Sequence, residues 1–176
     1  MNIVLFGITG FGNCVMEQMI DLNLAPKKIV TRYEKNSDPY TNQKHIYSLA
    51  EEKNIPVEYD VSCVKGSYDL CIVATYHKFI NLEKMNLKYA YNIHPSLLPK
   101  YKGKDPINEV IKKKEKISGV TVHKLTNKFD EGEIFFQEKI LIGNFDKGAI
   151  MKQMFPIYKS LTKKLLNLHL KKDFEK

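Results

Sequence analysis

The sequence predicts an α/β fold built on an open, mostly parallel β-sheet. Three observations predict it. Short apolar runs alternate along the chain with longer amphipathic segments, which is the pattern of strands connected by helices. The first apolar runs are unbroken, as in strands that are covered on both faces. Near the end of the chain two alternating strands follow each other closely, so the regular order is expected to change there.

The first elements are predicted from local signals. NIVLF (2–6) is a continuous apolar run and predicts a buried strand. Residues 13–24 carry apolar side chains at helical spacing, and KIVT (28–31) predicts a short second strand. The polar, turn-rich residues 32–42 predict a mobile loop. HIYSLAEEKN (45–54) predicts a helix that ends shortly before a proline.

The rest of the chain adds strands of two kinds. Two buried strands and two alternating strands are predicted at DLCIVAT (69–75), AYNIH (90–94), GVTVHKL (119–125) and EIFFQEKILI (133–142). Residues 105–116 predict a helix, and methionines and leucines at helical spacing over 147–170 predict a second one with a core-facing stripe. Ligands of open α/β sheets bind outside the carboxyl ends of the strands, so the loops after Phe6, Thr75 and Asn92 are the places to search.

Composition limits the classes of function. The chain has 176 residues, which suits a single domain over residues 1–176. The formal net charge of +8 favours anionic partners such as phosphates, nucleic acid or a membrane surface. However, the lysines are spread along the chain, and KKKEK at 112–116 is typical of a solvated helix face. Charge alone therefore supports a phosphorylated substrate only weakly.

Cysteine spacing and hydropathy predict the surroundings of the protein. The three cysteines form no C-x-x-C pair, which argues against a disulfide framework and a zinc site, and no metal site is predicted. No apolar run has the length of a membrane span, and no basic segment precedes the first apolar run as in a signal peptide. We therefore expect a cytoplasmic protein without a membrane partner.

The loop GITGFGN at residues 7–13 lies between the first predicted strand and the first helix. Its glycines do not fit the dinucleotide fingerprint G-x-G-x-x-G, and the second strand ends in KIVTR without an acid for a ribose hydroxyl. Glycines still let backbone N–H groups approach an anion at a helix N-terminus. Gly10, Gly12 and Asn13 are therefore candidates for binding a phosphate or carboxylate, and a tight turn without a ligand is the alternative.

Two polar side chains end a buried strand. Asn92 and His94 are two residues apart, so both point to one face of the sheet, and Pro95 keeps His94 extended. An amide and an imidazole on one face can both donate to an oxyanion that forms on a carbonyl group. A second polar group, Asp130, lies in a turn between two strands and is able to orient a histidine and collect a proton. A structural histidine and an ordinary turn aspartate are the alternatives.

Residues 92–103, NIHPSLLPKYKG, and 119–134, GVTVHKLTNKFDEGEI, resemble the formyltransferase family, whose formyl donor is 10-formyltetrahydrofolate. The resemblance implies a Rossmann-like open sheet, mostly parallel, with helices on both faces. It places the family's catalytic residues on Asn92, His94 and Asp130. His94 and Asn92 are then expected to stabilise the tetrahedral oxyanion. Asp130 is expected to orient His94 and to relay the proton, directly or through water.

The resemblance also implies where the donor binds. TYHKFI (75–80) matches the family's folate-contacting segment in position. The backbone of residues 78–80 is expected to meet the pterin ring, with Phe79 and Ile80 as apolar walls. The donor-binding residues implied in this way are His77, Lys78, Phe79, Ile80 and Asp130. Either polar residue of this segment, taken singly, is more often an exposed loop residue.

The acceptor stays open between branches of the family. The tRNA branch carries a C-terminal RNA-binding domain, which we expect this chain to lack, and the purine branch is a compact single domain. YKGKDPI (101–107) and MNIVLFGITGFGN (1–13) resemble the sugar and tRNA branches. We expect a nucleotide-linked amino sugar, with glycinamide ribonucleotide as the alternative and a homodimer as a compatible assembly. Expected acceptor contacts are Gly10, Phe11, Gly12, Asn13, Ser96, Lys102 and Gly103.

A non-catalytic binding module is the alternative from another class of function. The chain has no arginine-rich patch with interleaved aromatic residues and no recognisable RNA or DNA motif, so nucleic acid is not the expected partner. Strongly salt-dependent RNA binding without turnover would support the module. Release of tetrahydrofolate with an amine acceptor would exclude it.

Overall fold

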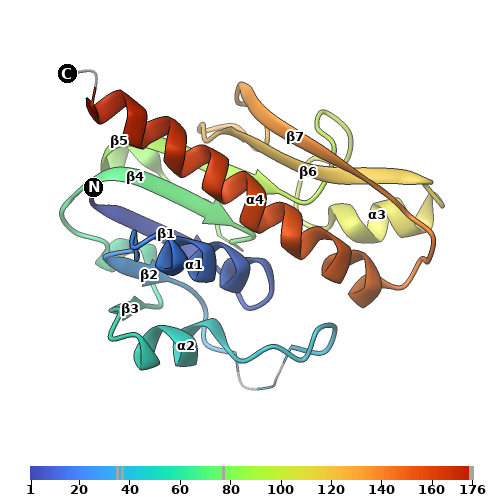
Figure 1. Ribbon diagram of the computed structural model, residues 1–176, viewed down its shortest axis with the longest axis horizontal. Helices are drawn as coiled ribbons and strands as arrows, with labels where there is room; N and C mark the ends of the chain where they lie inside the picture. Colours follow the sequence, from blue (N-terminus) through green and yellow to red (C-terminus); the bar gives the residue numbers. More distant parts are fainter. Residues whose placement is uncertain (35, 37, 77, 175–176) are drawn as a thin grey trace.

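The computed structural model describes residues 1–34, 36, 38–76 and 78–174. These residues form one seven-stranded sheet with the strand order β3-β2-β1-β4-β5-β6-β7 (Figure 1). The strands are β1 (Ile3–Gly7), β2 (Lys28–Val30), β3 (Val57–Glu58), β4 (Ser67–Ala74), β5 (Asn86–His94), β6 (Ile117–Lys124) and β7 (Ile134–Leu141). Strands β1 to β5 pair in parallel, whereas β6 and β7 pair antiparallel. The predicted α/β fold and the change of order near the end are confirmed.

Helices connect the strands at the predicted places. They are α1 (Phe11–Asp21), α2 (Ile46–Glu52), α3 (Pro106–Lys112), α4 (Lys147–Phe174) and the short 3-10 helices η1 (Val61–Cys63) and η2 (Leu82–Lys84). Helix α1 begins two residues before the predicted start, because the side chain of Asn13 accepts the backbone N–H of Gly10 at 3.1 Å and caps the first turn. Strand β3 and both 3-10 helices were not predicted, since two or three residues carry no periodic pattern.

The sheet separates two apolar cores of unequal size. Ile3 and Leu5 of β1 face the larger core, whereas Val4 and Phe6 face the smaller one, as alternation along a strand requires. Buried residues of all four α-helices belong to the larger core, where α1 and α4 lie side by side across the sheet (Figure 1). The segments around η1 and η2 cover the smaller core. Helices thus lie on both faces, but the long ones share one face.

Helix α4 confirms the predicted core-facing stripe near the C-terminal end. Its buried residues include Ile150, Met154, Tyr158, Leu161 and Leu165. The hydroxyl of Tyr158 donates to the carbonyl of Ile93 at 3.0 Å, which ties α4 to β5 one residue before the strand ends at His94. Of the residues that the structure describes, none belongs to a helix with the length and hydropathy to cross a bilayer.

Candidate functional site

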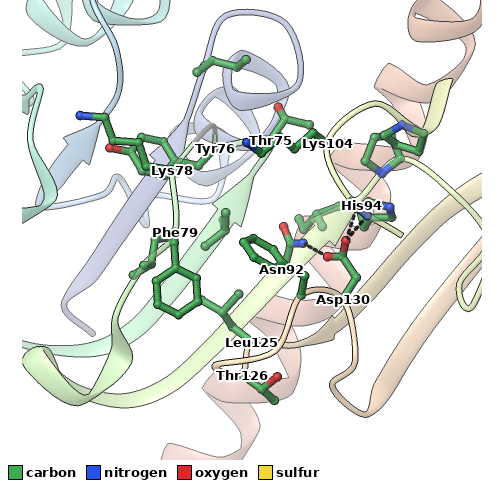
Figure 2. A pocket seen from close by; sticks show the side chains of 18 of the residues that line it. Thr75, Tyr76, Lys78, Phe79, Asn92, His94, Lys104, Leu125, Thr126 and Asp130 are labelled. Atoms are coloured by element: carbon green, nitrogen blue, oxygen red, sulfur yellow. Dashed lines mark hydrogen bonds and ion pairs between the residues drawn. The ribbon is translucent and has the colours of Figure 1, made fainter. Parts of the chain in front are cut away.

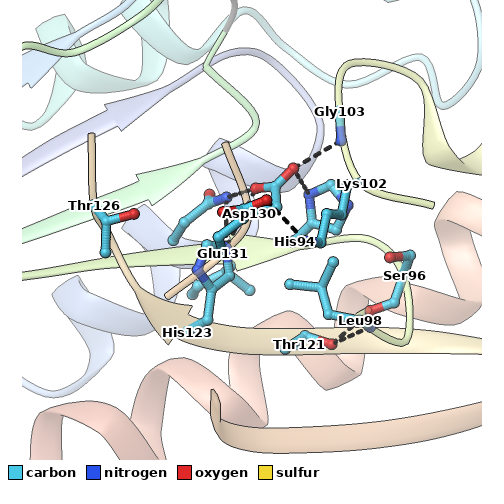
Figure 3. Close-up of polar contacts among 12 residues, drawn as sticks. His94, Ser96, Leu98, Lys102, Gly103, Thr121, His123, Thr126, Asp130 and Glu131 are labelled. Carbon is cyan, nitrogen blue, oxygen red and sulfur yellow. Dashed lines mark hydrogen bonds and ion pairs between the residues drawn. The ribbon is translucent and has the colours of Figure 1, made fainter. Parts of the chain in front are cut away.

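Polar side chains from three segments meet at the carboxyl end of β5. Asn92 and His94 lie on one face of this strand, and His123 of β6 stands directly opposite Asn92 in the antiparallel register. The turn between β6 and β7 brings Asp130 over the same strand end (Figure 3). Asp130 has a φ of 51°, a left-handed conformation that aspartate tolerates better than most residues, and this turns its carboxylate inward.

Asp130 is the centre of this cluster. Its Oδ2 atom accepts the backbone N–H of Gly103 at 2.8 Å and lies 3.6 Å from Nδ1 of His94 (Figure 3). Its Oδ1 atom accepts a hydrogen bond from Nδ2 of Asn92 at 3.1 Å and lies 3.3 Å from Nε2 of His123. Both carboxylate oxygens therefore have two polar neighbours, which fixes the plane of the carboxylate.

Asp130 is ionised at every physiological pH. Burial alone would raise the pKa of this carboxyl, but His123, the nearby ring of His94 and the N–H of Gly103 together outweigh burial and lower its pKa to about 2. A carboxylate with so low a pKa is a weak base. It therefore serves better as a fixed negative charge than as a proton store.

His94 is a buried, neutral imidazole. Its Nε2 atom lies 2.9 Å from the carbonyl oxygen of Tyr101, so Nε2 carries the proton and donates it there. Nδ1 of the neutral ring is then unprotonated and faces Asp130. Burial lowers the pKa of His94 below its ordinary value, although the Asp130 carboxylate and the Tyr101 carbonyl oppose this effect. The ring is thus a base at Nδ1 with a carboxylate beside it to stabilise the imidazolium.

His123 is a member of the cluster that sequence reasoning missed. Its Nδ1 atom donates to the carbonyl of Lys124 at 3.0 Å, and its Nε2 atom lies 3.1 Å from Nδ2 of Asn92 and 3.3 Å from Oδ1 of Asp130. Both N–H groups of the Asn92 amide are then directed, one to His123 and one to Asp130. The motif GVTVH was the only sequence signal, and it gave no strand register.

The cluster closes one end of a cavity of about 270 Å³. Asn92, His94 and Asp130 lie on one side of this cavity, with Phe79 and Lys78 on the opposite side (Figure 2). Phe79 contacts Phe129 edge-to-face with ring centres 5.7 Å apart, and both rings are largely exposed. We call this space the reaction-centre cavity. Of the predicted donor contacts, Lys78, Phe79 and Ile80 line it, whereas His77 lies outside the described residues.

A second cavity of about 840 Å³ adjoins the first. The two share the wall residues Ile8, Arg32, Thr75, Pro95, Lys104 and Pro106. Two of these, Arg32 and Lys104, are cations that sequence reasoning did not select. Arg32 follows β2 and Lys104 precedes α3, so only the folded sheet brings them to one place.

The glycine loop reaches the cavities with part of its length. Ile8 lines both cavities and Thr9 and Phe11 line the second, whereas Gly10, Gly12 and Asn13 line neither, so their predicted contacts with the acceptor stay predictions. The N–H of Gly10 is bonded to Asn13, whose amide also donates to the carbonyl of Lys44 at 2.9 Å. A Cβ atom on Gly12 would lie 2.8 Å from Cδ1 of Ile46. The loop is packed as a tight strand–helix turn.

The other predicted acceptor contacts divide in the same way. Gly103 lines the reaction-centre cavity and binds Asp130. Ser96 is fully buried, and its hydroxyl donates to the carbonyl of Lys100 at 2.7 Å, which shapes the loop after β5. The ammonium of Lys102 pairs with exposed Glu131 at 3.3 Å. Ser96 and Lys102 therefore support the loop and do not line either cavity.

Comparison with known proteins places these features in a family. A model described as formyl transferase matches residues 22–156. The methionyl-tRNA formyltransferase of Thermosipho africanus is 26% identical over 178 residues, which cover 95% of this chain and 59% of that protein.

Solved structures share the fold. The N-formyltransferase from Helicobacter canadensis, in complex with folinic acid and dTDP-3-aminofucose, has a TM-score of 0.76 at 22% identity, covering 95% of this chain and 64% of that one. The phosphoribosylglycinamide formyltransferase from Bacillus halodurans has a TM-score of 0.74 at 19% identity, covering 94% and 95%. The chain spans a little over half the length of the first curated relatives that it matches.

Proposed function

The chain belongs to the formyl transferase family, and we propose that it transfers a formyl group from 10-formyltetrahydrofolate to the primary amine of a nucleotide-linked amino sugar. The observation that carries the proposal is the cluster of Asn92, His94 and Asp130 at the end of a cavity with an apolar mouth. A base, a fixed carboxylate and an amide donor within one cluster are what acyl transfer to an amine requires.

The donor supplies an activated formyl carbon. A bond forms between this carbon and the acceptor nitrogen, the bond to N10 of the folate breaks, and the proton lost by the amine ends on N10. His94 carries this proton between the two nitrogens, because its unprotonated Nδ1 faces the cluster and its low pKa keeps the ring neutral beforehand. Asp130 stabilises the imidazolium that forms, from 3.6 Å.

Asn92 stabilises the negative charge that develops on the formyl oxygen. Its two N–H groups are directed to Asp130 and His123, so one of them changes partner when the oxyanion forms. The contacts of Asn92 with Asp130 and His123 also hold its amide in the orientation from which it donates to the oxyanion. His123 is thus a positioning residue, because it acts through Asn92.

The donor fits the reaction-centre cavity by shape and polarity. Its walls include the apolar side chains of Val73, Phe79, Ile80, Ile93, Leu125 and Phe129. The exposed rings of Phe79 and Phe129 offer flat surfaces for the aromatic parts of a folate. Backbone groups of residues 78–80 are at hand for the edge of a pterin ring. The solved sugar N-formyltransferase structures contain 5-N-formyl-tetrahydrofolate or folinic acid, which supports this choice of donor.

The acceptor then enters from the second cavity. Its wall carries Arg32 and Lys104 at the junction with the reaction centre, which suits a phosphorylated amine. One neighbour of similar fold was solved with dTDP-3-aminofucose, which supports an amino sugar linked to a nucleotide. Curated relatives that formylate methionyl-tRNA and neighbours that act on phosphoribosylglycinamide define the competing acceptors.

The test is a turnover assay with a panel of acceptors. The purified chain is mixed with 10-formyltetrahydrofolate and, in separate reactions, with nucleotide-linked 3- and 4-amino sugars, glycinamide ribonucleotide or methionyl-tRNA. Release of tetrahydrofolate is followed against a reaction without acceptor. We expect turnover with at least one amino sugar nucleotide. Turnover with glycinamide ribonucleotide or methionyl-tRNA alone would replace the acceptor, and no release with any of them would overturn the proposal.

A further inference from the structure

The second cavity extends from the reaction centre toward the loop between β2 and α2. This loop reaches the start of α4 (Figure 1), where Nζ of Lys147 lies 4.7 Å from the centre of the Tyr40 ring. We propose that the second cavity binds the nucleoside diphosphate part of the acceptor, with the base stacked on Tyr33. The inference rests on the formyl transfer proposed above and assigns residues to its acceptor.

Tyr33 is a supported yet exposed aromatic ring on the cavity wall. It is 70% exposed, although it stacks on Tyr47 with ring centres 5.6 Å apart and an angle of 20° between the planes. Tyr47 in turn stacks on His45 at 4.9 Å and 10°. Tyr59 meets Tyr33 edge-to-face at 6.3 Å. A ring held in this way loses little freedom when a further ring stacks on it, and stacking accepts any nucleobase.

Glu34 stands next to this ring and suits a ribose. The hydroxyl of Thr9 donates to its Oε2 atom, which also lies 3.7 Å from Nδ1 of His45, and Arg32 donates to its Oε1 atom from Nε at 3.1 Å and from Nη2 at 3.0 Å. The hydroxyl of Tyr47 donates to its backbone carbonyl at 3.2 Å. An ionised carboxylate accepts about four hydrogen bonds, so Glu34 retains capacity for a sugar hydroxyl. In dinucleotide-binding sheets, a carboxylate that follows the second strand binds a ribose hydroxyl.

The acid that the sequence pattern KIVTR lacked is therefore present, but later in the chain. Glu34 follows the end of β2 at Val30. The hydrogen bond from the Thr9 hydroxyl holds its carboxylate beside the glycine loop. The sequence did not reveal this carboxylate as a candidate, because the contact between Glu34 and Thr9 forms only in the folded chain.

Arg32 and Lys104 stand between the reaction centre and Tyr33, because each lines both cavities. Within the described part of the chain, no acidic side chain lies within ion-pair distance of the Lys104 ammonium. Arginine binds phosphate oxygens through two parallel donors, and lysine adds a point charge. Arg32 already donates from Nε and Nη2 to Oε1 of Glu34, so its remaining Nη1 donors and the Lys104 ammonium are the groups that this wall offers to a diphosphate.

The order of these groups along the cavities matches one class of molecule. An amine at His94, a diphosphate at Arg32 and Lys104, a ribose at Glu34 and a base at Tyr33 follow the connectivity of a nucleoside diphosphate amino sugar. An acceptor that ends in ribose 5-phosphate would leave the Tyr33 ring uncovered. Exposed Tyr33 thus favours the nucleotide-linked acceptor over the phosphoribosyl one.

The test compares binding of uridine 5′-diphosphate, thymidine 5′-diphosphate, ribose 5-phosphate and pyrophosphate by calorimetry. We expect the nucleoside diphosphates to bind at least tenfold more tightly than the other two. Tyr33→Ala should weaken nucleoside diphosphate binding about tenfold and leave pyrophosphate binding unchanged, whereas Tyr33→Phe should bind as the unmodified chain does. Tyr89→Ala is the matched control, since Tyr89 is another exposed tyrosine but lines neither cavity.

Two results would overturn the inference: equal affinities for the four probes, or unchanged nucleoside diphosphate binding in Tyr33→Ala. A parallel titration with 5-formyltetrahydrofolate separates this failure from that of the proposed function. Folate binding with no preference for nucleoside diphosphates would overturn the acceptor site alone. Nucleoside diphosphate binding without folate binding would uphold this site and overturn formyl transfer.

Discussion

The strand end at β5 and the turn after β1 lie at the same edge of the sheet, and both follow buried parallel strands. At β5 the chain places Asn92 and His94 into a cavity, where partners from two other segments complete a charged cluster. At β1 the glycines bring helix α1 close to the strand, and the polar groups of Gly10 and Asn13 satisfy each other.

The difference shows what each type of residue signals. A polar side chain on a buried strand has to be paired or used, so its presence is informative about chemistry. A glycine signals only that the backbone comes close to something, and here that is Ile46 of α2 and Gly7 of β1. We therefore expect substitutions at β5 to impair catalysis and substitutions at the turn to impair folding.

Of the substitutions that test this comparison, the replacement of His94 should have the largest effect on turnover. His94→Ala removes the base of the cluster, so we expect turnover to fall about 10²- to 10³-fold, within the range for losing a positioned acid–base group. The rate of tetrahydrofolate release at saturating substrates measures it. His169→Ala is the matched control, because it removes another buried imidazole, from α4, and should leave turnover within about twofold. Near-normal turnover in His94→Ala would mean that the cluster is structural.

Replacing Asp130 should have a smaller effect on rate and a distinctive effect on pH dependence. Asp130→Asn leaves the imidazole in place, so we expect turnover to fall about 10- to 10²-fold. In the unmodified chain, activity should persist below the ordinary pKa of histidine and fall as the pH drops through the lowered pKa of His94. The Asp130 carboxylate raises that pKa against burial, so removing it should lower the pKa further.

The acid limb of the pH–rate profile should therefore move to lower pH in Asp130→Asn. Rates measured between pH 5 and 8 in the unmodified chain and in Asp130→Asn test this shift of the acid limb. A limb that stays in place or moves to higher pH would show that another group controls the proton.

The two regions also differ in how far the sequence could predict them. Alternation along a strand was enough to place Asn92 and His94 on one face, and family resemblance added Asp130. His123 depended on the register between β5 and β6, which no local pattern contains. Arg32 and Lys104 depended on loops that lie far apart in the sequence and meet only across the sheet. At the glycine turn the pattern allowed both a ligand and a packed backbone, and it could not show that Ile46 packs against Gly12.

Replacing Gly12 should have the smallest effect on catalysis and a clear effect on stability. A Cβ atom there would lie 2.8 Å from Cδ1 of Ile46 and 3.2 Å from the backbone of Gly7, so the Ile46 side chain has to move and the packing of α1 on β1 has to loosen slightly. We expect Gly12→Ala to lower the free energy of unfolding by about 1–3 kcal/mol, the usual effect of overpacking. Urea unfolding measures this change. Gly143→Ala is the matched control, since a Cβ atom there meets no described atom within 4 Å.

Turnover per folded molecule is the second measurement on Gly12→Ala, and it returns to the comparison between the two strand ends. Since the turn lies behind Thr9 and Phe11 and not on the cavity wall, we expect kcat and the acceptor KM to stay within about threefold. An unchanged free energy of unfolding together with a tenfold higher acceptor KM would reverse that expectation. The glycine turn would then bind the acceptor anion directly, and the two strand ends would share one function.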